Sequence, residues 1–490
     1  MKRNNIIFLV IISLISSIFL SGCQKRQTYD ETSQVKKDIY RLYDDLKAEA
    51  INIDEKHPIN KMLLSCLRKE GLSAKETEDG AIITDKKKKT AKKESTVTFL
   101  ANYSSKYNKE EIQVWTIAIA TIKNLPENKN ACLILIPKKN KEASYKKIFK
   151  KIPEENLKNK NIVDLTWNKK TTAFVQGSET FGFYINKHLN YIKPKGSKAF
   201  RITISGLEPG DSGDLTEKHN NPIVYLSEII ASMKSGGLTV ELAKFHCKGK
   251  ISDYPVKAYA TIVVDESAVE KVETKLENSA NNFRDINRHR AENAALTFKP
   301  VKCPRKSLNY NDTAEILSLL YTLKENVLAT SLPDEEGEPL AITNISSIHL
   351  DKKARIQAIG RSVDPTVSSN MLHNFRQSAN LSDFSLKSIR RYKGWNSVNN
   401  FKLIASPKTV DNTMPEEIQP AGNAPLTTMI IEHFDKNDLY LEPKNMFQEG
   451  KMSALIPYLS KKSQIISMGI NINDSQETAL AFITLIDSIK

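Results

Sequence analysis

The chain lacks the short motifs by which several classes of enzyme are recognised. It contains no HExxH zinc motif, no phosphate-binding P-loop and no GxSxG nucleophile elbow. Its five cysteines are far apart and form no CxxC pair, so neither a zinc knuckle nor a disulfide framework is expected. The sequence leaves undecided whether one opportunistic disulfide forms among Cys66, Cys132, Cys247 and Cys303. His246 and Cys247 are neighbours in a predicted strand and lie on opposite faces of it, which excludes a Cys–His catalytic pair.

Histidine is also scarce. The eight histidines form no pair at the close spacing that metal-binding motifs use. We therefore expect each of them to be a surface or packed side chain rather than a metal ligand.

An apolar run at the N-terminus has the form of an export signal. Lys2 and Arg3 precede the run Ile6–Ile18, which is shorter than the ~20 residues of a membrane-spanning helix. Small residues then lead to a cysteine, in the order Leu20-Ser21-Gly22-Cys23. This ending resembles the lipobox of bacterial lipoproteins, in which the cysteine thiol receives a diacylglyceryl group. The alternative is an ordinary secretory signal with a chance cysteine.

The resemblance to lipoproteins implies a signal peptide over residues 1–22 and a lipidated tether over residues 23–30. A lipid bilayer is then the partner of Cys23, and the protein is expected in the bacterial cell envelope. Gln24 stands where an Asp usually retains Gram-negative lipoproteins at the inner membrane. The outer membrane is therefore favoured over the inner one if the host is Gram-negative.

The net charge of +15 comes mostly from lysine. It could favour anionic lipid headgroups or acidic polymers, but we favour the simpler interpretation of a lysine-rich solvated surface. The densest basic run, Lys86–Lys89, lies between two predicted strands and lacks interleaved aromatic residues. No nucleic-acid partner is expected.

Hydrophobic periodicity predicts one α/β domain that is interrupted by a long insertion. Residues 31–197 and 396–490 alternate helices with strands, as expected for a mixed sheet covered by helices. Residues 198–395 instead repeat a strand–helix–strand–strand pattern, which predicts a separate α+β domain of two half-similar units. Phe200–Ser205, which alternates apolar and polar residues, is its first expected strand.

The insertion carries several distinctive segments in a fixed order. Arg201–Gly213 combines a strand with a turn that contains Pro209-Gly210-Asp211, and Thr330-Ser331-Leu332, Arg361-Ser362-Val363-Asp364 and Tyr392-Lys393-Gly394-Trp395 follow it. These segments resemble the lid domain of the aminoacyl-histidine dipeptidases, a branch of the co-catalytic zinc exopeptidases. The resemblance implies an α/β fold with a zinc-exopeptidase-like catalytic domain and an inserted α+β lid.

The chain departs from this family where the family holds its two zinc ions. Such a site needs carboxylate and imidazole ligands and a glutamate as general base. The resemblance places the degenerate metal-site positions at Asn102, Lys109, Lys138, Lys139, Thr166 and Asp474. Asp211 and Gln448 also stand where the family carries a substrate-gripping His and Glu. Because lysines beside the metals would repel them, the sequence predicts no metal and no catalytic residue.

We therefore predict a non-catalytic binding or structural lipoprotein that needs no cofactor. Lys109, Lys138, Lys139 and Lys444 could converge to bind a small anionic or peptide ligand, or the cleft could be collapsed with these lysines in solvent. The sequence leaves undecided whether the chain forms a homo-oligomer through the lid.

The rival hypothesis is a divergent metallo-dipeptidase that hydrolyses small peptides. It would keep one zinc ion through Asp164, Asp474 or Glu110.

Overall fold

A computed structural model describes residues 33–53, 58–86, 97–139, 142–158, 160–215, 219–323, 327–331, 338–396, 426–441, 443–446, 451–459 and 463–489. The chain divides into two compact units. The first unit comprises residues 1–175, 396–444 and 454–490, and the second comprises residues 176–395 and 445–453. The predicted fold class is confirmed, because a mixed α/β sheet is interrupted by an inserted domain with an antiparallel sheet.

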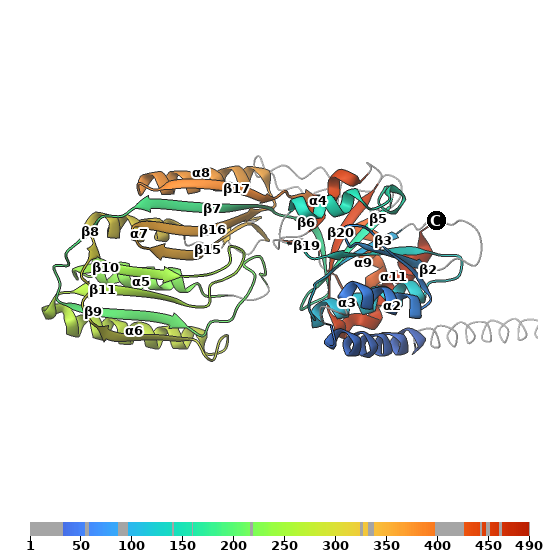
Figure 1. Ribbon diagram of the computed structural model, residues 1–490, viewed down its shortest axis with the longest axis horizontal. Helices are drawn as coiled ribbons and strands as arrows, with labels where there is room; N and C mark the ends of the chain where they lie inside the picture. The colour runs from blue at the N-terminus through green and yellow to red at the C-terminus, as the bar shows by residue number, and fades with distance from the viewer. Residues whose placement is uncertain are drawn as a thin grey trace, which may run out of the picture. The chain divides into compact units, whose positions relative to one another are not determined.

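The first unit is built on a sheet whose central strands are parallel (Figure 1). These strands lie in the order β4 (Ala131–Pro137), β3 (Val97–Tyr103), β5 (Asn161–Trp167) and β20 (Gln464–Ile470). Because parallel strands end at the same edge, the residues that follow them gather there, as at the binding edge of other α/β folds. The flanking strands are β1 (Leu72–Glu76), β2 (Ile82–Lys86), β6 (Thr172–Gly177), β18 (Trp395–Asn396) and β19 (Pro443–Met446).

Helices cover this sheet and form the first hydrophobic core. Residues 33–51 are helical, and their periodic apolar side chains, from Val35 to Ala50, are buried. In α3 (Lys109–Lys123) every residue from Glu111 to Ile122 is buried, as expected of a helix that is apolar on all sides. The other helices of this unit are α2 (Ile59–Lys69), α4 (Glu142–Lys150), η1 (Glu154–Asn156), α9 (Leu426–Asp435), α10 (Met452–Leu455), η3 (Ile456–Tyr458), η4 (Ile472–Asp474) and α11 (Ser475–Ser488).

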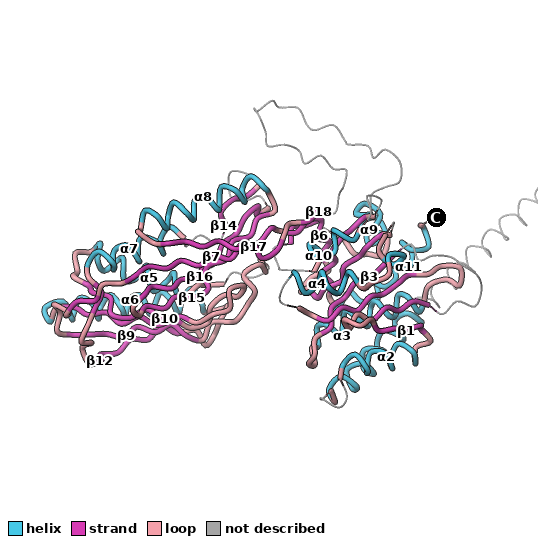
Figure 2. The backbone as a smooth tube through the Cα atoms, turned by 45° about the horizontal axis from the view of Figure 1, so that its top comes forward, coloured by secondary structure: helices cyan, strands magenta, loops and turns pink. Residues whose placement is uncertain are grey.

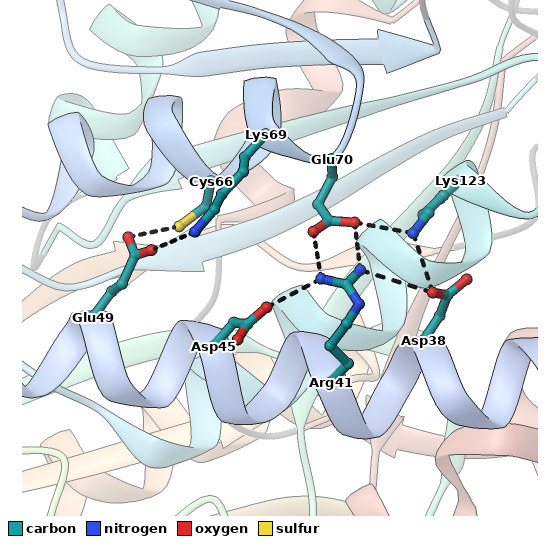
Figure 3. A network of polar contacts seen from close by, with 8 residues as sticks. All are labelled: Asp38, Arg41, Asp45, Glu49, Cys66, Lys69, Glu70 and Lys123. Atoms are coloured by element: carbon teal, nitrogen blue, oxygen red, sulfur yellow. Dashed lines mark hydrogen bonds and ion pairs between the residues drawn. The ribbon is translucent and has the colours of Figure 1, made fainter.

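A polar network joins the helix of residues 33–51 to α2 and α3 (Figure 3). Arg41 donates two hydrogen bonds to the carboxylate of Glu70, at 2.7 and 2.6 Å. Lys123 bonds both Glu70 and Asp38, each at 3.1 Å. The bonds from Arg41 hold the pKa of Glu70 below its ordinary value. Burial alone would raise the pKa of Asp38, but the bonds from Lys123 and Asn124 lower it.

The second unit contains one antiparallel sheet made of two similar halves. One half has the strand order β12-β9-β11-β10, and the other continues as β15-β16-β7-β17. When β7 is taken as the counterpart of β9, the strand order of the second half is that of the first half reversed. The junction between β10 and β15 therefore lies at the centre of the sheet. The strands are β7 (Glu179–His188), β9 (Lys198–Ser205), β10 (Val240–Cys247), β11 (Ala258–Val264), β12 (Ala295–Val301), β15 (Pro339–Leu350), β16 (Lys353–Ser362) and β17 (Ser385–Tyr392).

The predicted lid boundary at residue 198 is wrong at its N-terminal side. The second unit begins at Gln176, because β7 pairs with β16 along its whole length and with β17 on its other side. The sequence pattern misses this because β7 precedes the rest of its own half by more than a hundred residues and pairs only with distant strands. The predicted doubling itself is present in the strand order.

Four helices lie along one face of this sheet (Figures 1 and 2). They are α5 (Pro222–Ser235), α6 (Val269–Asn287), α7 (Tyr310–Thr322) and α8 (Pro365–Leu381), and they bury the second core against one side of the strands. The remaining short elements are β8 (Tyr191–Ile192), β13 (Ser307–Leu308), β14 (Val327–Thr330) and η2 (Glu266–Ala268).

The signal peptide and Cys23 lie outside the described residues. In the part of the chain that is described, no helix combines the length and apolarity that crossing a bilayer requires. Cys66, Cys132, Cys247 and Cys303 are free thiols, so the open question of a disulfide among them is answered in the negative for this structure.

Candidate functional site

The carboxyl edge of the first sheet brings several predicted site positions to one side of the unit. Asn102 and Thr166 are the second-to-last residues of β3 and β5, and Lys138 follows β4 directly. Asp474 stands four residues beyond the end of β20. The parallel pairings β3–β4, β3–β5 and β5–β20 place all of these ends at the same edge.

Asn102, one of the positions that the resemblance gives as a degenerate metal site, has a structural role. Its backbone oxygen accepts a 2.8 Å hydrogen bond from the indole of Trp115, which is fully buried in α3. The side-chain Oδ1 of Asn102 is buried without a hydrogen-bond partner among the described residues. A neutral amide at this position offers a metal ion one weak oxygen ligand and no charge.

The structure gives no indication that Lys109 itself binds a ligand. It is the exposed first residue of α3, because Asn108 caps that helix through bonds to the backbone N–H groups of Glu110 and Glu111. The carboxylate of Glu111 accepts two hydrogen bonds from Ser104, one from its backbone N–H and one from its hydroxyl, each at 2.6 Å. Glu111 is therefore already occupied by a partner within the chain. Glu110, offered as a ligand under the rival hypothesis, is exposed.

The remaining carboxylates at this edge are separately engaged. Asp164 is 2% exposed within β5 and accepts a 3.3 Å bond from Ser467 on β20. Asp474 precedes α11 and accepts a 2.6 Å bond from Thr171. Over the described ranges, no group of three or more His, Cys, Asp or Glu side chains could hold a metal ion. The residues present at this edge therefore do not fit a pair of zinc ions.

A pocket of about 780 Å³ opens beside the ends of β3 and β4. Lys106, Lys138 and Lys139 line it together with Tyr103 and Tyr107. Two of the four lysines predicted to bind an anion are thus at the pocket. Its lining does not include the other two, Lys109 and Lys444, the latter lying exposed on β19.

Hydrogen bonds to backbone groups hold the residues along one side of this pocket in place. The N–H of Lys138 donates to the oxygen of Tyr103 at 2.8 Å, and the N–H of Lys139 donates to the hydroxyl of Tyr145 at 3.0 Å. The hydroxyl of Tyr103 donates to the oxygen of Gly80 at 2.5 Å. Burial raises the pKa of both Tyr103 and Tyr145 to about 12, so both hydroxyls keep their protons at neutral pH.

The second unit carries an ion pair between a buried arginine and a half-exposed aspartate at the turn of residues 209–211. Arg361 on β16 is 1% exposed and donates to Ser212 at 2.6 Å and to Asp211 at 3.1 Å. Asp211, which the resemblance placed at the position of a substrate-gripping His, therefore forms an ion pair with an arginine of its own chain. Gln448 lies outside the described residues.

Two features were missed by sequence reasoning. Lys106 and Tyr107 follow β3 in a loop, and only the pocket shows their relation to Lys138. His246 and His349 face each other across β10 and β15, which no spacing rule could indicate because the two strands are distant in the sequence. Burial, His349 and Lys248 lower the pKa of His246.

Comparison with known proteins supports the fold. No protein-family model and no curated protein matches the chain. The crystal structure of aminoacylhistidine dipeptidase from Vibrio alginolyticus superposes with a TM-score of 0.60 and 11% identity, over 92% of this chain and 96% of that one.

Two further solved structures match the chain with lower scores. A hydantoinase/carbamoylase family amidase from Burkholderia ambifaria has a TM-score of 0.46 and 6% identity, over 92% of this chain and 96% of the other. The M20 family metallo-carboxypeptidase Sso-CP2 from Sulfolobus solfataricus has a TM-score of 0.42 and 12% identity, over 91% and 99%. At such identities the likeness shows a peptidase-like fold alone.

Proposed function

We propose that this chain uses a dipeptidase-like fold as a non-catalytic binding protein. The pocket at the carboxyl edge of its first sheet would take a small ligand with a carboxylate or phosphate group. The observation that carries the proposal is the gathering of Lys106, Lys138 and Lys139 around a pocket at the carboxyl edge of the first sheet.

The chemistry of the lining suits an anion. All three lysines are exposed, and none of them forms an ion pair with another described residue, so their charges are available to a ligand. Tyr107, 41% exposed, offers an aromatic face to the rest of the ligand. A carboxylate or phosphate would be held by charge-assisted hydrogen bonds from the ammonium groups.

Calorimetric titration of the mature chain with inorganic phosphate and with the dipeptide glycylglycine tests this proposal. Lys138→Ala/Lys139→Ala should weaken binding by about 3- to 10-fold, less than for buried charges because these lysines are solvated. The control is Lys36→Ala/Lys37→Ala, which removes two adjacent exposed lysines from the same unit but outside the pocket. Equal affinity in the two double variants would contradict the proposal.

The whole-chain likeness to a dipeptidase favours a second candidate, a divergent metallo-dipeptidase. In it Asp474 and Asp164 would keep one metal ion at the carboxyl edge. The arrangement argues against this, because Thr171 and Ser467 engage these carboxylates and lysines stand where the glutamate base belongs.

The two candidates differ in metal content and turnover. The binding proposal expects no dipeptide hydrolysis with added zinc, manganese or cobalt, and no metal at the first sheet after dialysis. Elemental analysis and a dipeptidase assay measure both. Turnover that is lost in Asp474→Ala would instead establish the second candidate.

We also propose that the protein is held in the bacterial envelope by lipid on Cys23. The support is the sequence Leu20-Ser21-Gly22-Cys23 behind a basic and apolar leader. If the host is Gram-negative, the outer membrane is favoured over the inner one because Gln24 follows the cysteine.

A further inference from the structure

Two histidines meet at the centre of the doubled sheet. His246 on β10 and His349 on β15 are direct partners in the antiparallel register. Their Nδ1 atoms are 2.8 Å apart, and their rings stand nearly perpendicular, at 82°. One neutral ring therefore donates a hydrogen bond to the other.

The pair lies on the face of the sheet that the four helices leave uncovered. Phe245 and Cys247, the chain neighbours of His246, point into the helix-covered core. Both histidines are therefore on the opposite side, and the side chain of His349 is 42% exposed. The two rings therefore lie outside the helix-covered core, with His246 half-buried.

A carboxylate lies beside one of the two rings. Nε2 of His349 is 3.4 Å from Oδ2 of Asp351, and Asp351 is itself held by Arg355 and by the backbone N–H of Lys353. Metal-binding histidines commonly donate their second ring N–H to a carboxylate, which fixes the tautomer and leaves the other nitrogen as the ligand. Here that other nitrogen is Nδ1, the atom that faces His246.

We propose that His246 and His349 form a two-histidine site for a borderline divalent transition metal ion such as Zn²⁺, Ni²⁺ or Cu²⁺. Imidazole nitrogen is a preferred ligand of these ions. Metal–nitrogen distances of about 2.0–2.1 Å in a tetrahedral site separate two ligands by roughly 3.3 Å, so the rings need to open by only about half an ångström. Water completes the coordination.

The surrounding charges set a limit on the affinity. Lys248, which directly follows β10, and Arg355, the register partner of His349, disfavour a cation. Asp351 offsets them in part. Tyr259 lies on the other side of His246, with ring centroids 5.4 Å apart. We therefore expect reversible binding that dialysis removes, distinct from a permanent structural metal.

A metal at this position would connect the two halves of the sheet. The β10–β15 junction has only two register pairs, His246 with His349 and Cys247 with Ile348. An ion bound to one histidine from each half bridges that short ladder and stabilises the assembled unit. The inference is independent of the pocket in the first unit.

The test titrates the full mature chain with ZnCl₂ and with NiCl₂ by calorimetry. His246→Ala and His349→Ala should each bind one equivalent less than the unaltered chain. His373→Ala, which removes an exposed histidine of α8, should bind the same number. Asp351→Asn should keep the site but bind about 10-fold more weakly.

Thermal unfolding provides a second readout and checks that the variants fold. At a metal concentration roughly 100 times Kd, Tm should rise by about 5 °C in the unaltered chain and in His373→Ala. It should not rise in His246→Ala or His349→Ala. Equal stoichiometry and equal Tm shifts in all the histidine variants would overturn the proposal and leave a His–His hydrogen bond only.

Discussion

At the scale of single residues, Gly206, which directly follows β9, has a backbone conformation and close neighbours that leave no room for a side chain. Its φ is +78°, and an added Cβ would lie 1.9 Å from the backbone oxygen of Asn293. Gly206→Ala should therefore lower the free energy of unfolding by about 3 kcal/mol or more, through left-handed strain and a backbone clash. Urea denaturation of the full chain measures this.

Gly237, which follows α5, is the matched control for this substitution. Its φ is +82°, but an added Cβ would meet nothing within 4 Å. Gly237→Ala should cost only about 1–2 kcal/mol, from the left-handed conformation alone. Equal losses in the two variants would show that the clash at Gly206 relaxes without cost.

At the scale of elements, the network in Figure 3 predicts how acid affects the first unit. The lowered pKa of Glu70 and of Asp38 means that both carboxylates stabilise the folded state at neutral pH. This stabilisation is lost as the pH falls from their ordinary values of 4.5 and 3.8 through the lowered folded-state values. Glu70→Gln should cost about 1–3 kcal/mol at neutral pH and reduce the further loss in acid.

Urea midpoints measured across this pH range test the prediction. Asp45→Asn is the control, because Asp45 bonds the same Arg41 at 3.0 Å but its side chain is 51% exposed. Its effect should stay below about 0.5 kcal/mol. A pH profile for Glu70→Gln that parallels that of the unaltered chain would assign the acid sensitivity to other carboxyl groups.

At the scale of the whole molecule, the proposed anchor predicts where the protein is found. Cys23→Ala should abolish labelling by radioactive palmitate and leave an uncleaved precursor or a soluble form, because no thiol remains to receive lipid. Cys303→Ala, which removes a half-buried free thiol, should leave the labelling unchanged. Wash-resistant membrane association of Cys23→Ala without lipid would refute the anchor.

The sequence by itself determined the fold class and the doubled insertion. Periodic apolar residues identify a helix or strand locally, so the helix of residues 33–51 and strands such as β3 and β9 could be predicted. The predicted positions Asn102, Lys138 and Thr166 could be placed at the carboxyl edge because each lies within two residues of the end of a recognisable strand. Lys109 lies outside the pocket lining, and its place follows from the Asn108 cap at the start of α3.

Only the tertiary structure decided which distant segments meet. β7 joins the second sheet through hydrogen bonds to β16 and β17, and an apolar pattern does not specify the partner of a strand. The same holds for the pocket that unites Lys106 with Lys138, and for His246 and His349, which are about a hundred residues apart. Such contacts depend on long-range packing, in which each strand's partner is selected by the whole sheet rather than by its own residues.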